Sequence, residues 1–163
     1  MRKSDSLIIK IKNPPQPAKM PTLYAKTEIH APRSHVWQVL MDKHQWFHWN
    51  TFFYDLSPDR PFRQGKTVRL SIKRVMGEEE TQIEPLVTLV QPLVCLSLRY
   101  TAPGFRSEHW FELQDLGSDR TQYLHRETLS GALTTLLLPF IRRDEQHGLR
   151  RMAQELKRYA ERG

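Results

Sequence analysis

The sequence predicts an α+β domain in which a curved antiparallel sheet wraps around one long C-terminal helix, with two short helices after the first strand. Three observations lead to this class. Strand-forming segments fill most of residues 52–129, a helical periodicity takes over in the final third, and a short helical stretch follows the first strand. A curved antiparallel sheet leaves one face to cover, and a single long helix can cover it.

The first strand is expected in TLYAKTEIHA, residues 22–31, which alternates between apolar and polar residues. The next segment, APRSHVWQVLMD, has a proline suited to a first helical turn and apolar residues at helical spacing. A second short helix is predicted over residues 42–47, with Asp42 as its N-cap.

The remaining strands are separated by turn-forming sequences such as Gln91-Pro92 and the run Ala102-Pro103-Gly104. If Gln91-Pro92 is a tight turn, Val87 lies opposite Leu96 and Leu89 opposite Val94. The expected strands are residues 66–75, 79–90, 93–101, 106–116 and 120–129.

The final third predicts an amphipathic helix, because apolar residues recur three, four or seven positions apart while arginines and glutamates occupy the other face. The apolar series is Leu137, Ile141, Gly148, Met152, Leu156 and Tyr159.

Composition and charge indicate the cellular compartment and the surfaces that the protein can contact. Of the 163 residues only one is cysteine, and no apolar run approaches the roughly 20 residues that span a bilayer, so we expect a cytoplasmic protein without an internal disulfide. The net charge of +7 comes from the two ends. Residues 1–21 are basic and contain proline, and we interpret them as an extension preceding a domain at 22–163. Such an arm can contact acidic membranes weakly; no specific nucleic-acid motif is present.

Several segments of the sequence resemble those of a known protein family. IHAPRSHVWQVLMDKHQWFHWNTF, residues 29–52, resembles the opening of START-like proteins of the polyketide cyclase/dehydrase group, the SRPBCC superfamily. EHWFEL, RTQYLHRETLSG and the terminal MAQELKRYAE resemble its late strands and last helix. The resemblance implies the helix-grip fold. It implies no single activity, because lipid carriers, cyclases, hydroxylase domains and chaperone activators share that fold. Thr51 stands where the family usually has proline, which predicts a looser loop.

Strand alternation places two histidines and a carboxylate, His109, His125 and Glu127, on the same face as the apolar residues. His109 should lie close to His125 or Glu127. The preferred interpretation is a hydrogen-bonded polar network, because a buried carboxylate needs a partner. A ligand-orienting or acid/base cluster is the next interpretation. Zinc held by these three residues is the least favoured, since no tight ligand spacing supports it.

The other histidines, the aromatic residues and the cysteine are weaker candidates for a functional site. His44 and His48 are four residues apart, but the glutamate of a metalloprotease motif is absent, so we expect surface residues. Trp37 is expected in the core, and Trp46, Trp49 and Phe52 over the mouth of a cavity. Cys95 lies on the face opposite Leu96, without signs of activation.

The hypothesis is a domain that binds, and in one version transports, a small hydrophobic or amphipathic ligand between sheet and helix. The alternatives are a cyclase- or dehydratase-like enzyme using His109, His125 and Glu127, and a docking module acting through the basic arm. No catalytic residue, metal or cofactor is assigned. The predicted ligand-binding residues are Trp49, Ile83, Val87, Leu96, Leu98, Tyr100, His109, Phe111, Tyr123, His125, Glu127, Ile141, Glu145 and Met152.

Overall fold

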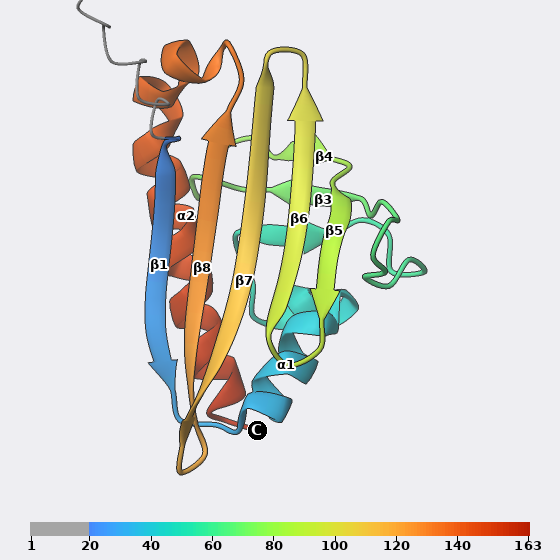
Figure 1. Ribbon diagram of the computed structural model, residues 1–163, viewed down its shortest axis with the longest axis vertical. Coiled ribbons are helices and arrows are strands. Elements are labelled where there is room, and N and C mark those ends of the chain that lie inside the picture. Colours follow the sequence, from blue (N-terminus) through green and yellow to red (C-terminus); the bar gives the residue numbers. More distant parts are fainter. Residues whose placement is uncertain (1–19) are drawn as a thin grey trace, which may run out of the picture.

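The computed structural model describes residues 20–163, and the predicted arm at residues 1–21 falls almost entirely outside this part of the chain (Figure 1). The elements are β1 (Thr22–Ile29), α1 (Arg33–Met41), the 3₁₀ helix η1 (Lys43–His48), β2 (Phe53–Asp55), β3 (Leu70–Ile72), β4 (Thr81–Ile83), β5 (Leu86–Gln91), β6 (Cys95–Ala102), β7 (Phe105–Gly117), β8 (Arg120–Ser130) and α2 (Thr134–Ala160).

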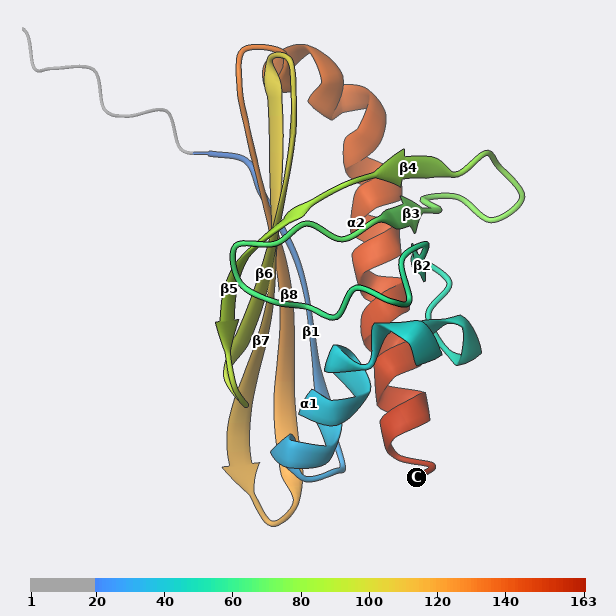
Figure 2. The same cartoon turned by 90° about the vertical axis from the view of Figure 1, so that its right-hand side faces the viewer.

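The large sheet has five antiparallel strands in the order β1-β8-β7-β6-β5. Figure 2 shows this sheet edge-on, with α1, η1, α2 and a small second sheet, β2-β3-β4, on one side of it. Charged residues pair on the other face, where Arg99 meets Glu108 at 3.3 Å and Arg126 meets Glu112 at 3.4 Å. The predicted α+β helix-grip architecture is confirmed.

The strand expected at residues 79–90 is instead two strands that belong to different sheets. β4 ends at Ile83, β5 begins at Leu86, and Pro85 between them has no N–H for a sheet hydrogen bond. The chain therefore passes from the small sheet to the large one at this point. This transfer was not predicted, and neither was the short strand β2.

The register of β5 against β6 also differs from the prediction. Leu96 pairs with Val90 instead of Val87 because the connection is longer than a tight turn. A bulge between Val87 and Leu89 then shifts the pairing by one residue, so that Val87 lies opposite Leu98. The expected tight turn at Gln91-Pro92 is a longer connection, since Gln91 pairs with Cys95. As a result Val94 lies outside the paired strands and is exposed instead of facing inward.

Thr51 is firmly held, contrary to the looser loop that the departure from the family pattern predicted. Its backbone N–H donates to Glu155 Oε2 at 2.9 Å, and its hydroxyl donates to Glu155 Oε1 at 2.6 Å. Arg151 Nε donates to the same hydroxyl at 2.9 Å. Proline lacks the N–H for the first of these bonds, so threonine ties the segment before β2 to α2 in a way that proline could not.

Asp42 does not cap η1, as had been expected, because its side chain makes no capping hydrogen bond and instead contacts His44 Nδ1. Its neighbour Lys43 has the structural role: the buried Lys43 ammonium pairs with Asp55 Oδ1 at 2.6 Å. This ion pair fixes η1 to the end of β2.

α2 has a buried face and an exposed apolar end. Gly148, Met152 and Leu156 of the predicted apolar series are buried, and so is Leu149, whereas Leu137 of that series is exposed. Near its start, large apolar side chains are exposed: Leu133, Leu136, Leu137 and Phe140. Within residues 20–163 no helix is long and apolar enough to cross a bilayer.

Gly148 lets α2 approach the Phe52 ring. A Cβ atom added at Gly148 would lie 2.2 Å from Phe52 Cε2, far inside van der Waals contact. Phe52 is fully buried, so its ring has little freedom to withdraw.

We expect Gly148→Ala to destabilise the protein by about 1–3 kcal/mol, because overpacking outweighs the roughly 1 kcal/mol that alanine gains as a helix former. Chemical denaturation measures this loss. Phe52→Leu, which shortens the opposing side chain, should recover part of it in the double variant. If Gly148→Ala proves as stable as the wild type, the steric interpretation is wrong.

Candidate functional site

Two neighbouring strands bring the predicted polar residues together in the interior. His109 on β7 pairs with Glu127 on β8, and His125 pairs with Phe111 one position further along the same face. His109 Nδ1 lies 3.0 Å from His125 Nε2, and Ser107 donates its hydroxyl to Glu127 Oε1 at 2.6 Å. All three predicted residues are buried. These distances confirm that His109 lies close to His125 and Glu127, as predicted. Alternation along two paired strands was sufficient to predict this.

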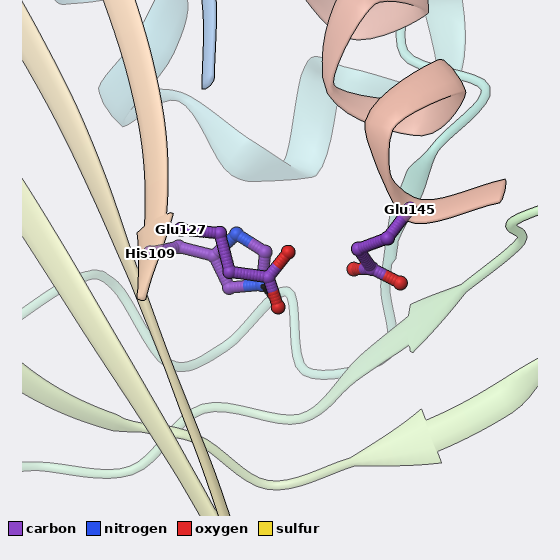
Figure 3. A group of neighbouring side chains, drawn as sticks. All are labelled: His109, Glu127 and Glu145. Carbon is purple, nitrogen blue, oxygen red and sulfur yellow. Dashed lines mark ion pairs between the residues drawn. The ribbon is translucent and has the colours of Figure 1, made fainter. Parts of the chain in front are cut away.

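The fourth member of the group comes from the helix. Glu145 of α2 is 1% exposed and points toward Glu127 across the space between sheet and helix (Figure 3). Ligand-type atoms of His109, Glu127 and Glu145 all lie within 4.8 Å of one another. Arg74, in the loop after β3, donates Nε to Glu145 Oε2. The sequence placed Glu145 on the inward face of the helix, but nothing in it indicated Arg74 or Ser107.

Burial controls the charge of these groups. It lowers the pKa of His109 to about 3, with a smaller contribution from the positive charge of Arg74, and lowers the pKa of His125 well below its ordinary value. Burial and the neighbouring Glu145 carboxylate raise the pKa of Glu127 well above its ordinary value. Burial therefore favours the uncharged forms of both histidines and of Glu127 in the folded protein.

Several buried polar atoms of this group have no hydrogen-bond partner. They are Tyr123 Oη, His125 Nδ1, Glu127 Oε2 and Glu145 Oε1. An unpaired buried polar group costs about 1–3 kcal/mol, so such groups are rare in folded proteins and typically mark a place where water, an ion or a ligand binds. Four of them in one interior region make this the candidate site.

The surroundings of the polar group are aromatic and apolar. The Phe53 ring centre lies 5.2 Å from that of His109, and the Phe111 ring centre lies 4.4 Å from that of His125. Among the predicted apolar lining residues, Tyr100 and Ile141 are half-buried. The others are buried in the core: Ile83, Val87, Leu96, Leu98, Phe111 and Met152. Phe53, which the sequence did not single out, shares this space with Phe52.

Trp37 packs against the core as expected, but Trp46 and Trp49 have different positions from those expected. Trp46 is fully buried, and its Nε1 donates to the Leu40 carbonyl at 3.1 Å, so it belongs to the core and not to a cavity mouth. Trp49 packs against Tyr159 with ring centres 6.2 Å apart. It lines a surface depression of about 640 Å³, away from the polar group, together with His35, Gln38, Val39, Asp42, Gln45, His48, Tyr159, Arg162 and Gly163.

Comparison with known proteins identifies the fold. No protein-family model matches the chain, and no curated protein sequence matches it. Solved structures do match it. Norcoclaurine synthase from Thalictrum flavum, a point mutant in complex with a transition state analogue, has 13% identity and a TM-score of 0.61 over 87% of this chain and 94% of the other. A START superfamily protein from Mycobacterium smegmatis has 16% identity and a TM-score of 0.54 over 82% and 97%.

A third match is DynU16, a protein of the dynemicin biosynthetic locus, with 17% identity and a TM-score of 0.59. The match covers 86% of this chain but only 47% of DynU16, so this chain corresponds to about half of that protein. The three structures share the fold that the sequence resemblance implied. The chain therefore has the START-like helix-grip fold.

The buried histidines predict a pH dependence of stability. Their folded pKa values lie below the ordinary 6.5, so only the unfolded state takes up these protons, and stability is lost as the pH falls below 6.5. Glu127 acts in the opposite direction, because its folded pKa lies above the ordinary 4.5 and stability is lost as the pH rises. Two histidines oppose one glutamate, so the net stability should fall as the pH falls from 6.5 to 4.5.

Denaturation in metal-free buffer across this pH range tests the assignment. The double variant His109→Gln/His125→Gln leaves only the Glu127 effect, so its stability should instead rise as the pH falls. An unchanged slope in the variant would mean that other groups set the pH dependence.

Cys95 should be unreactive in the folded protein. Burial raises the pKa of its thiol from 9.0 to about 11, and the side chain is covered. Because two pKa units lower the thiolate fraction about a hundredfold at pH 8, labelling by a thiol reagent should be at least that much slower in the native protein than in urea. Equal rates would show that Cys95 is accessible.

Proposed function

We propose that this protein binds a small amphipathic molecule between the five-stranded sheet and α2, with the polar end of the ligand on Tyr123 and His125. The observation that supports this most strongly is that Tyr123 Oη and His125 Nδ1 are buried and unpaired, two residues apart on the inward face of β8. A hydroxyl or carbonyl group of a ligand can hydrogen-bond to both side chains, which removes the cost of leaving them unpaired.

The apolar part of the ligand packs on the residues around this pair. Leu96 and Leu98 of β6, Phe111 of β7 and Met152 of α2 are buried on the facing surfaces of sheet and helix. Such a combination, apolar walls with a few polar groups, is typical of small-molecule sites. Because Phe53 lies against His109, ligand binding requires its ring to turn aside, whereas Phe52 stays in contact with Gly148.

The end of the molecule where α2 begins offers access. There the inward-facing residues become partly exposed, as Tyr100 on β6 and Ile141 on α2 do. Leu136 and Phe140, on the first turns of α2, are 65% and 77% exposed. An apolar ligand can slide along these side chains, which have no partner among the described residues that would bury them.

The first test is native mass spectrometry of the purified protein, with identification of any molecule that is released on denaturation. A bound apolar molecule with a hydroxyl or carbonyl end supports the proposal. If the protein converts that molecule to a product on re-addition, the enzyme hypothesis replaces simple binding.

The second test uses 2-naphthol as a fluorescent probe. Tyr123→Phe removes one hydrogen bond and should weaken binding about tenfold. Tyr159→Phe is the matched control, since Tyr159 lines the surface depression instead. If Tyr159→Phe weakens binding and Tyr123→Phe does not, the ligand occupies the depression, and the proposed site is wrong. The proposal also fails if no apolar probe binds.

A further inference from the structure

We propose that His109, Glu127 and Glu145 form a binding site for one divalent first-row transition-metal ion. The three residues come from β7, β8 and α2, and each is at most 3% exposed. Their ligand-type atoms gather within 4.8 Å of one another, and Figure 3 shows the two carboxyl groups facing each other beside the imidazole. From the sequence, zinc on His109, His125 and Glu127 was the least favoured interpretation. The set found here has Glu145 in place of His125, and its members are spread over 37 positions and meet only when α2 packs on the sheet.

Each of the three side chains has one polar atom held from outside the group. His125 Nε2 lies 3.0 Å from His109 Nδ1, Ser107 donates to Glu127 Oε1 at 2.6 Å, and Arg74 donates to Glu145 Oε2. Outer contacts of this kind orient the ligands in known metal sites, where a ligating histidine typically donates its second ring N–H to a neighbour.

Two oxygen atoms of the carboxyl groups lack a partner. Glu127 Oε2 and Glu145 Oε1 have no hydrogen-bond partner although both residues are buried. His109 Nε2 lies 3.5 Å from Glu127 Oε1, on the side of the ring away from His125. For Nε2 to bind a metal, the ring proton must be on Nδ1 and donate to His125 Nε2. His125 then carries its own proton on Nδ1, the atom that lacks a partner.

The donor set determines the class of ion. One imidazole nitrogen and two carboxylate oxygens suit Zn²⁺, Mn²⁺ or Fe²⁺, whereas Ca²⁺ and Mg²⁺ prefer oxygen ligands alone and Cu⁺ prefers sulfur. Ligands on such an ion lie about 3.0–3.6 Å apart, so the group must contract by roughly 1 Å when the ion binds. Of the two carboxylates Arg74 contacts only that of Glu145, and a divalent ion supplies the further charge that two ionised carboxylates need in a buried site.

The experiment starts from protein treated with EDTA and dialysed into metal-free buffer. Isothermal titration with Zn²⁺ and elemental analysis after gel filtration should give one ion per chain, and Zn²⁺ should raise Tm. His109→Gln and Glu145→Gln each remove one ligand and should weaken binding at least a hundredfold. Ser107→Ala removes only an outer contact and should weaken it by about 10- to 100-fold.

Two controls identify the site. His48→Gln removes an exposed histidine near His44, and Glu155→Gln changes a carboxylate of the same helix that holds Thr51; both variants should bind Zn²⁺ as the wild type does. Circular dichroism establishes that every variant folds. The proposal is overturned if the wild type binds no ion, if His109→Gln and Glu145→Gln bind normally, or if His48→Gln abolishes binding. Binding of 2-naphthol by the EDTA-treated protein is a separate readout, so this proposal can fail while the proposed function stands.

Discussion

The contact between the Phe52 ring and the backbone of Gly148 sets how closely α2 approaches the rest of the molecule. No side chain fits at position 148, so the helix rests directly on the aromatic ring. Glu145 lies three residues earlier on the same side of the helix, and the close approach brings its carboxyl group to the sheet. Arg151, three residues later, donates to the carbonyl groups of Lys73 and Arg74. The seating of α2 thus places both Glu145 and the arginine that contacts it.

In the interior between sheet and helix, burial has two opposing effects on stability. Apolar burial stabilises the packing of sheet on helix, while the same burial makes each polar group inside expensive. His109, Glu127 and Glu145 are only partly satisfied. Each has one polar atom with a partner outside the group, while Glu127 Oε2 and Glu145 Oε1 have none. Because an all-apolar core would avoid the cost altogether, the retention of these groups supports a role in binding.

Features that depend on local alternation could be predicted from the sequence. The period of two along residues 106–116 and 120–129 was sufficient to put His109, His125 and Glu127 on the inward face, and the period of the last helix put Glu145 inward as well. Features that depend on distant packing could not. The shift of Leu96 from Val87 to Val90 follows from the longer connection between β5 and β6, and the convergence of Arg74 on Glu145 follows from a loop whose course no periodicity specifies.

The order of the strands has a consequence for how the chain is made. Among the described strands β1 leaves the ribosome first, yet its partner is β8, with Thr22 opposite Thr128. Strands β5, β6 and β7 each pair with the next strand in the chain and can assemble as they emerge. β1 therefore stays unpaired until roughly a hundred more residues have been synthesised, and its backbone N–H and C=O groups are meanwhile open to water or to other chains. The pairing of β1 with the sheet is therefore a late event in biosynthesis. A chain that stops before residue 120 lacks β8 and so has no partner strand for β1.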